Sequence, residues 1–249
     1  MQTVVLTIGG IFWILTYVFI ISKGFKDKTY GMPLIALCIN ISWEFIFSLI
    51  LPHSPPQLFV NYLWFGLDSI IVFQFFKYHK NEFLNMSSLK VYTSFGLLIF
   101  SAFSIILFGT IVLDDHRGVY AAFGQNLLMS ILFVVMFFKR GRGLRGQSIF
   151  IAVFKMMGTG LTSLHFYLYE PVSQSSFVLP SLFVSILFFD LFMSYWWQIN
   201  TGKIIYLYSR FEHLLYLVIF RMYVRSFVIV YYATSVDYSN CGVRLLSDR

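Results

Sequence analysis

Charged residues are scarce in this chain. Only 12% of its 249 residues are Asp, Glu, Lys or Arg, whereas 58% are hydrophobic. Soluble domains carry about 25% charged residues, so the composition excludes an ordinary soluble enzyme and indicates an integral membrane protein. The formal net charge of +7 does not predict nucleic-acid binding, because the basic residues punctuate apolar runs and form no basic domain.

Cysteines and familiar catalytic motifs are equally scarce. The two cysteines, Cys38 and Cys241, provide neither a disulfide framework nor a CxxC metal pattern. The chain contains no HExxH, Walker A or GxSxG sequence, so the chemistries of these motifs have no support, and we expect no metal and no cofactor. Aromatic residues are abundant, at 20% of the chain. Aliphatic side chains would match lipid equally well, so we expect some of the rings to line an internal space.

Long apolar segments account for most of the chain. A spanning helix needs about 20 mostly apolar residues. Seven segments approach this length, at 4–22, 32–51, 58–76, 91–113, 119–138, 148–169 and 177–199. We therefore predict an all-α integral membrane protein, a bundle of seven transmembrane helices. The first segment lacks a basic n-region, so we expect it to be a retained helix.

The links between the segments predict the orientation. Those after segments one, three and five contain ten basic residues: Lys23, Lys26, Lys28, Lys77, Lys80, Lys90, Lys139, Arg140, Arg142 and Arg145. The links after segments two, four and six contain one basic residue, Arg117. The positive-inside rule then places the N-terminus outside and the end of segment seven in the cytoplasm.

The chain divides into two regions of different composition. Residues 1–201 form the predicted seven-helix domain, and we find no internal repeat. Charged residues interrupt the apolar runs of residues 202–249, including Arg210, Glu212 and Arg221, so no uncharged run there reaches 18 residues. We expect this region to be a cytoplasmic or interfacial amphipathic tail.

Three acidic residues fall within predicted spans, and they are Glu44, Asp68 and Asp190. A carboxylate at the centre of a membrane helix costs roughly 2.5–3.5 kcal/mol on insertion scales, so an intramembrane acid is a candidate functional residue. Lys155 is a cation well inside a span. It either extends towards the cytoplasm or pairs with an acid such as Asp190. Pairing would keep one carboxylate ionised and leave another acid free to hold a proton.

Other polar side chains are expected near the depth of Glu44. At 1.5 Å per residue, Glu44 and Asp68 lie roughly 10 Å below the outer surface. Asn40 precedes Glu44 by four residues and so shares its helix face. Gln125, Asn126 and His165 come to a similar level on two further segments. These neutral residues either line a polar cavity or form interhelical hydrogen bonds, and the latter is common in membrane proteins.

Several of these segments resemble a known family. The matching runs are GMPLIALCINISWEF, LWFGLDSIIVFQFFKY, GQNLLMSILF and KMMGTG. Together with the order of the segments, they resemble the transmembrane terpene cyclases, small seven-helix proteins best known from fungal meroterpenoid and indole-diterpenoid pathways, with bacterial relatives. The resemblance covers about residues 1–200.

The resemblance implies an enzyme that cyclises a prenyl or prenylated substrate, with or without an epoxide, after protonation. It implies catalytic roles for Glu44, in SWEF, and Asp190, in FFDLFMSY. Asp68 would organise the polar layer, and Trp43 and Trp64 are candidate rings for stabilising carbocations. The chain lacks the DDxxD pattern that binds magnesium diphosphate in soluble terpene synthases.

The implied partners are the lipid bilayer and an isoprenoid or prenylated small molecule, and the oligomeric state is left open. The alternative is a proton-coupled transporter or ligand-sensing protein that uses the same acids as a relay. Against it, the chain has no inverted repeat.

Overall fold

The computed structural model describes residues 2–140 and 145–201, and every regular element within these ranges is helical. The main helices are α1 (Gln2–Lys26), α2 (Leu34–Phe45), α3 (Gln57–Tyr78), α4 (Ser88–Val112), α5 (Val119–Lys139), α6 (Ile149–Tyr169), the short α7 (Pro171–Gln174) and α8 (Val178–Thr201). A π-helical turn, η1 (Ile46–Ile50), continues α2, and a 3-10 turn, η2 (His79–Asn81), follows α3. The predicted tail at 202–249 and the basic loop residue Arg142 lie outside the described residues.

Six of these helices are long and apolar enough to cross a membrane. The helical segment Leu34–Ile50 is also apolar but shorter than the predicted span at 32–51. Its limits follow from proline, because Pro33 precedes the first turn and Pro52 follows Leu51, and a proline ring disfavours helix in the residue before it. The protein is therefore an all-helical, multi-pass membrane protein.

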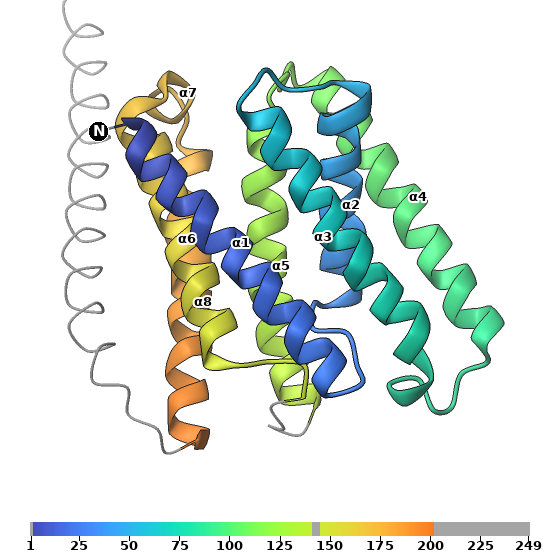
Figure 1. Cartoon of the computed structure of the whole chain (residues 1–249). Coiled ribbons are helices and arrows are strands. Elements are labelled where there is room, and N and C mark those ends of the chain that lie inside the picture. Colours follow the sequence, from blue (N-terminus) through green and yellow to red (C-terminus); the bar gives the residue numbers. More distant parts are fainter. Residues whose placement is uncertain (1, 141–144, 202–249) are drawn as a thin grey trace, which may run out of the picture. The chain divides into compact units, whose positions relative to one another are not determined.

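Two groups of helices make up the bundle (Figure 1). α6 packs against α1 and α8, while α2 packs against α3 and α4. α5 joins the groups because it contacts both α8 and α2, and α1 also contacts α3. The interior between α1, α2, α3 and α5 therefore receives side chains from both groups.

The contact between α1 and α6 depends on two glycines. A Cβ atom built on Gly158 would lie 2.8 Å from Cδ1 of Trp13 and 3.2 Å from the carbonyl oxygen of Gly9. Small residues allow membrane helices to approach closely, and larger ones would separate α1 from α6. This approach holds Trp13 of α1 against α6.

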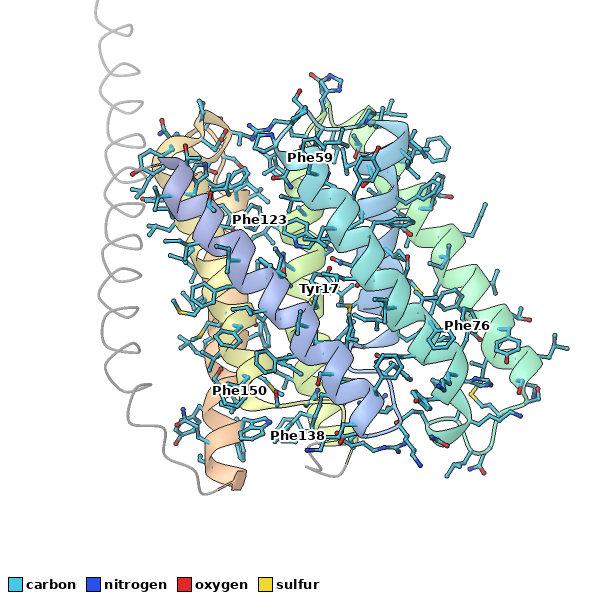
Figure 2. All side chains as sticks on the ribbon, viewed as in Figure 1. Tyr17, Phe59, Phe76, Phe123, Phe138 and Phe150 are labelled. Carbon is cyan, nitrogen blue, oxygen red and sulfur yellow. The ribbon has the colours of Figure 1, made fainter. Side chains whose placement is uncertain are left out.

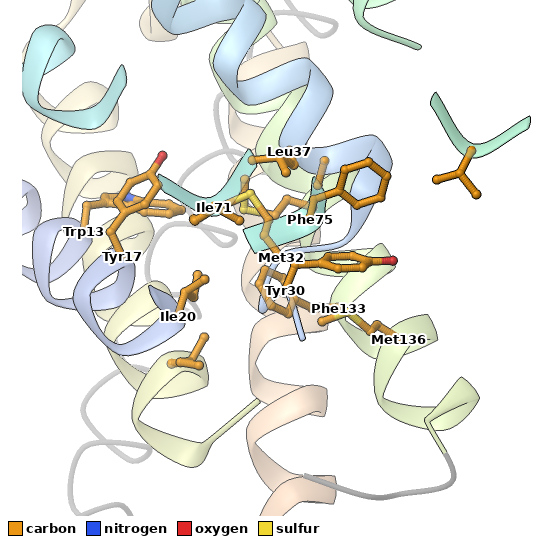
Figure 3. Packing of buried hydrophobic residues seen from close by; sticks show 14 residues of the cluster. Trp13, Tyr17, Ile20, Tyr30, Met32, Leu37, Ile71, Phe75, Phe133 and Met136 are labelled. Carbon is orange, nitrogen blue, oxygen red and sulfur yellow. The ribbon is translucent and has the colours of Figure 1, made fainter. Parts of the chain in front are cut away.

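The main hydrophobic cluster fills the interior. It contains Trp13, Tyr17, Ile71, Phe75 and Phe133, from α1, α3 and α5, with further residues from α2 and the preceding loop. Figure 3 shows Trp13 and Tyr17 near each other on α1, next to Ile71. Among all the side chains of the bundle, Tyr17 lies near the middle of its height (Figure 2).

The basic loops meet at one end of the bundle. Glu82 accepts ion pairs from Arg140 at 3.4 Å and Arg145 at 3.3 Å. Asp27 accepts a hydrogen bond from the backbone N–H of Gly146 at 2.7 Å. The three links that carry most of the positive charge are thus tied together on one side of the molecule.

A second set of contacts joins the loops that contain few basic residues. The His53 ring contacts the carbonyl oxygen of Arg117 at 3.2 Å, and the Arg117 guanidinium pairs with Glu170 at 2.7 Å. Asp115 accepts hydrogen bonds from the backbone N–H groups of Val119 and Tyr120, so it caps the start of α5. The loops are thus grouped in the alternating manner that the sequence predicts.

Candidate functional site

Glu44 and Asp68 lie together in the interior of the bundle. Their exposed fractions are 2% and 0%, although they come from different helices, α2 and α3. Asn40, one turn before Glu44 on α2, connects them. Its amide nitrogen lies 2.9 Å from Oε1 of Glu44 and 2.8 Å from Oδ2 of Asp68. Both carboxyls are therefore within hydrogen-bond distance of the same amide nitrogen.

Tyr17 of α1 completes the contacts of Glu44. The Tyr17 hydroxyl donates a hydrogen bond to Oε1 of Glu44 at 2.7 Å and accepts one from the Asn40 amide at 2.5 Å. Sequence reasoning missed this residue, because one tyrosine among sixteen in an apolar segment is inconspicuous. Its only signal was the spacing of Trp13, Tyr17 and Ile20, which places three buried side chains on one face of α1.

Gln125 adds a fourth helix to this cluster. Its amide nitrogen donates to Oδ1 of Asn40 at 3.1 Å from α5. The predicted residues Asn40, Glu44, Asp68 and Gln125 are thus brought together with Tyr17, and we call these five residues the acid cluster. α1, α2, α3 and α5 each contribute at least one side chain to it.

One oxygen of each carboxyl in the acid cluster has no hydrogen-bond partner among the described residues. These atoms are Oε2 of Glu44 and Oδ1 of Asp68. No ion pair joins a described Lys or Arg to either acid; the donors to their other oxygens are a hydroxyl and an amide. A buried carboxyl without a cation is far more stable as the neutral acid than as the carboxylate. The cluster can therefore hold a transferable proton.

Asp190 lies in a different environment. Lys155 of α6 reaches both of its oxygens, at 2.9 Å and 3.1 Å, and also donates to the Ser130 hydroxyl at 2.7 Å. Lys155 and Asp190 are 3% and 4% exposed. We call Ser130, Lys155 and Asp190 the lysine cluster, which joins α5, α6 and α8. Of the two predicted alternatives for Lys155, the structure has the pairing with Asp190.

A pocket lies beside the lysine cluster. Lys155 and Asp190 form part of its wall, and the rest includes Phe133, Gln147 and Ile151. The Lys155 ammonium also lies 5.9 Å from the centre of the Trp13 ring. Trp13 in turn packs against Tyr17, with their ring centres 6.2 Å apart. Trp13 therefore contacts both the ammonium of the lysine cluster and Tyr17 of the acid cluster.

The remaining predicted site residues are dispersed. Trp43 donates its indole N–H to the carbonyl oxygen of Gly118 at 3.1 Å and belongs to a separate hydrophobic cluster with Ile46 and Phe47. Trp64 packs against the main cluster that contains Tyr17. Both tryptophans were predicted to stabilise carbocations, but they pack against different hydrophobic clusters.

Asn126 and His165 form no hydrogen bond with the acid cluster among the described residues. The Asn126 backbone accepts a hydrogen bond from Ser130, whereas its side-chain oxygen has no partner among the described residues. The His165 ring lies 3.7 Å from Glu170, near the outer-loop contacts of Arg117. The sequence predicted that these residues lie at the same membrane depth as Glu44. Depth does not determine the direction in which a side chain points.

Comparison with known families and proteins gives a consistent result. Residues 1–198 match the family described as Pyr4-like transmembrane terpene cyclases. The chain is 29% identical over 136 residues to the Pyr4-family terpene cyclase mfmH of Annulohypoxylon moriforme, covering 53% of this chain and 56% of that protein. It is 32% identical over 158 residues to the asnovolin H synthase nvfL of Aspergillus novofumigatus, covering 60% of this chain and 63% of that protein.

A third relative is the terpene cyclase pyr4 of Aspergillus fumigatus, which is 35% identical over 74 residues, covering 29% of this chain and 31% of that protein. The matches therefore span between 31% and 63% of the length of these relatives. No solved structure matches the chain. The range matched by the family includes both the acid cluster and the lysine cluster, and the chain belongs to the Pyr4-like transmembrane terpene cyclases.

Proposed function

We propose that the protein is a membrane-embedded terpene cyclase that starts cyclisation by protonating an alkene or epoxide of a prenyl or prenylated substrate. The observation that carries this proposal is the Glu44 carboxyl, which is buried, lacks a cationic partner and has one unpartnered oxygen. Such a group can give a proton to a weakly basic substrate in the absence of water. The names of the relatives support the same activity.

Glu44 is the proton donor in this proposal. When its proton leaves, the carboxylate that forms keeps two donors on Oε1, the Tyr17 hydroxyl and the Asn40 amide. Hydrogen bonds to a charged acceptor contribute roughly 1.5–3 kcal/mol, about twice those between neutral groups. Both donors are already in place before transfer, so little reorganisation accompanies the charge that develops.

The rings of Trp13 and Tyr17 are the best-placed candidates for stabilising a carbocation. Tyr17 belongs to the acid cluster, and Trp13 packs against it and already has an ammonium group near its face. A cation over an aromatic face is stabilised by about 0.5–2 kcal/mol. This assignment adds Trp13 to the predicted Trp64 and gives Trp43 a packing role.

Asp190 is proposed as the second acidic residue of the reaction, acting as a carboxylate. Lys155 supplies a positive charge at 2.9 Å, which stabilises the ionised form. A carboxylate can accept the proton that the last carbocation loses, whereas a neutral acid cannot. The two acids that the family resemblance identified would then act at opposite ends of the reaction.

The topology completes the proposal. The helix Leu34–Ile50 would act as a seventh, short transmembrane segment, with the N-terminus outside and the basic loops in the cytoplasm. A prenyl substrate dissolved in the bilayer would enter the bundle from the membrane. The bilayer that surrounds the helices would thus also be the source of the substrate.

The proposal is tested by expressing the chain in a host supplied with farnesyl- and geranylgeranyl-substituted substrates, both epoxidised and not. We expect cyclic isomers in the lipid extract with the wild-type chain and none with Glu44→Gln. Gln74→Met is the matched control, since Gln74 is equally buried and hydrogen-bonded to Ile21 away from the acids. No cyclic product from a folded wild-type chain with any substrate, or full turnover by Glu44→Gln, would reject the proposal.

A further inference from the structure

Asn40 has a fixed orientation in the acid cluster. Its side-chain oxygen accepts from Gln125, so the NH₂ group must face the acids and Tyr17. An amide has two N–H donors, yet this nitrogen lies within 2.9 Å of three oxygens, on Glu44, Asp68 and Tyr17. The Tyr17 hydroxyl supplies one further donor, directed at Glu44. The amide therefore shares its two hydrogens among three oxygens, and at most three hydrogens are available to the two carboxyl groups.

These three hydrogens all reach the same side of the acid pair. They are directed at Oε1 of Glu44 and Oδ2 of Asp68, and the other two carboxyl oxygens receive none from the described residues. Two adjacent carboxylates in a site without a cation repel each other and lose their hydration, so both cannot be ionised together. At least one proton of their own must remain, on an oxygen that has no other donor.

We propose that Glu44 and Asp68 form a coupled pair of neutral acids, with one acidic proton on Oε2 of Glu44 and one on Oδ1 of Asp68, in which Glu44 gives up its proton and Asp68 keeps its own and acts as a positioning residue for Glu44. This inference rests on the proposed function for its catalytic part. The resemblance to the family directed attention to Glu44 and Asp190, whereas the geometry joins Glu44 with Asp68. Asp68 then assists without touching the substrate.

The proton transfer balances as follows. The O–H bond of Glu44 breaks while a new C–H bond forms on an alkene, or a new O–H bond forms on an epoxide. The electron pair stays on Oε2 of Glu44, and the Asp68 carboxyl donates a hydrogen bond to that oxygen. The final carbocation loses a proton to the Asp190 carboxylate, which restores the number of protons on the protein. Before the next turnover Asp190 releases this proton to solvent and Glu44 takes one up.

The lysine cluster has the opposite arrangement. There the Asp190 oxygens face the Lys155 ammonium, so that pair is neutral overall without an acidic proton. Asp190 is not a proton donor in this scheme, because both of its oxygens face the Lys155 ammonium.

Infrared spectroscopy tests the pair independently of turnover. Protonated carboxyl groups absorb separately from carboxylates, and the band shifts in deuterium oxide. We expect the full-length protein in lipid vesicles to show such a band, Glu44→Gln/Asp68→Asn to lack it, and Asp68→Asn to shift the band that remains from Glu44. A Glu44 band unchanged in Asp68→Asn, or no protonated-carboxyl band in the wild type, would overturn the proposal. Gln74→Met should leave the band as it is.

Kinetics test the catalytic part. Loss of one hydrogen bond to a charged group predicts that Asp68→Leu lowers kcat about 10- to 100-fold, with KM changed by less than about threefold, whereas Asp68→Asn keeps an amide donor and should retain most of the activity. An unchanged kcat in Asp68→Leu, or a change confined to KM, would overturn the positioning role. Failure of the proposed function is separately recognisable, because the wild type would then make no cyclic product while the infrared result would still stand.

Discussion

The acid cluster and the lysine cluster place the same functional group in two different electrostatic environments. Glu44 and Asp68 are buried with an amide and a hydroxyl, whereas Asp190 is buried with an ammonium group. Only the second environment supplies the charge needed to hold a carboxylate away from water. Burial alone therefore does not assign a role to an intramembrane acid. Its partners decide whether it carries a proton or a charge.

The largest expected effect is on the acid cluster. Glu44→Gln keeps the shape of the side chain and can still accept from Tyr17, but it has no acidic proton. We expect product formation to fall by about 10³- to 10⁴-fold, at the upper end of the range for general acids. The measurement is cyclic product per mole of folded protein, with folding checked by size-exclusion chromatography. Substantial turnover would remove Glu44 from the role of proton donor.

The lysine cluster should respond through stability. Lys155→Met leaves the Asp190 carboxylate buried without its cation, and breaking such a pair costs roughly 3–5 kcal/mol. We expect a lower thermal-unfolding temperature, with most of the loss recovered in Lys155→Met/Asp190→Leu. The corresponding double change in the acid cluster, Glu44→Gln/Asp68→Asn, should lower stability far less. Equal losses of stability in Lys155→Met and in Glu44→Gln/Asp68→Asn would contradict the distinction between the two clusters.

Tyr17→Phe tests a single donor to the acid cluster. The substitution removes the 2.7 Å hydrogen bond to Glu44 but keeps the ring that packs against Trp13. The loss of about 1.5–3 kcal/mol should reduce kcat roughly 10- to 100-fold. Tyr30→Phe is the matched control, because Tyr30 is a buried residue of the same hydrophobic cluster and its hydroxyl forms no hydrogen bond with either acid among the described residues. A kcat as high in Tyr17→Phe as in the control would show that the hydroxyl has no part in proton donation.

The smallest effect is expected in the outer loops. Hydrogen bonds from the Arg117 guanidinium lower the pKa of Glu170, so the pair stabilises the fold above the unfolded pKa of about 4.3 and loses this contribution as pH falls through the folded pKa. Because both side chains are partly exposed, Arg117→Gln should lower the free energy of unfolding by only about 0.2–1 kcal/mol near pH 7. Melting temperatures of the two proteins should converge under strongly acidic conditions. A constant difference at every pH would assign the effect to packing against Phe166.

Much of this organisation could be predicted from the sequence. The apolar segments predicted the long helices, although the segment at 32–51 yields the shorter helix Leu34–Ile50. The four-residue spacing of Asn40 and Glu44 predicted their shared face, because an α-helix repeats every 3.6 residues. Tyr17 could not be predicted, since its contact with Glu44 bridges 27 residues of sequence.

The apolar segments of the sequence were enough to predict a bundle of membrane helices and to identify the few charged residues within them. These properties depend on the composition of each segment, because each spanning helix must be apolar enough to remain in the bilayer. Only the tertiary structure decided that Glu44 meets Asp68 and Tyr17, whereas Asp190 meets Lys155 across 35 residues. The partner of a buried charge depends on how helices rotate and pack against one another, and no single helix contains that information.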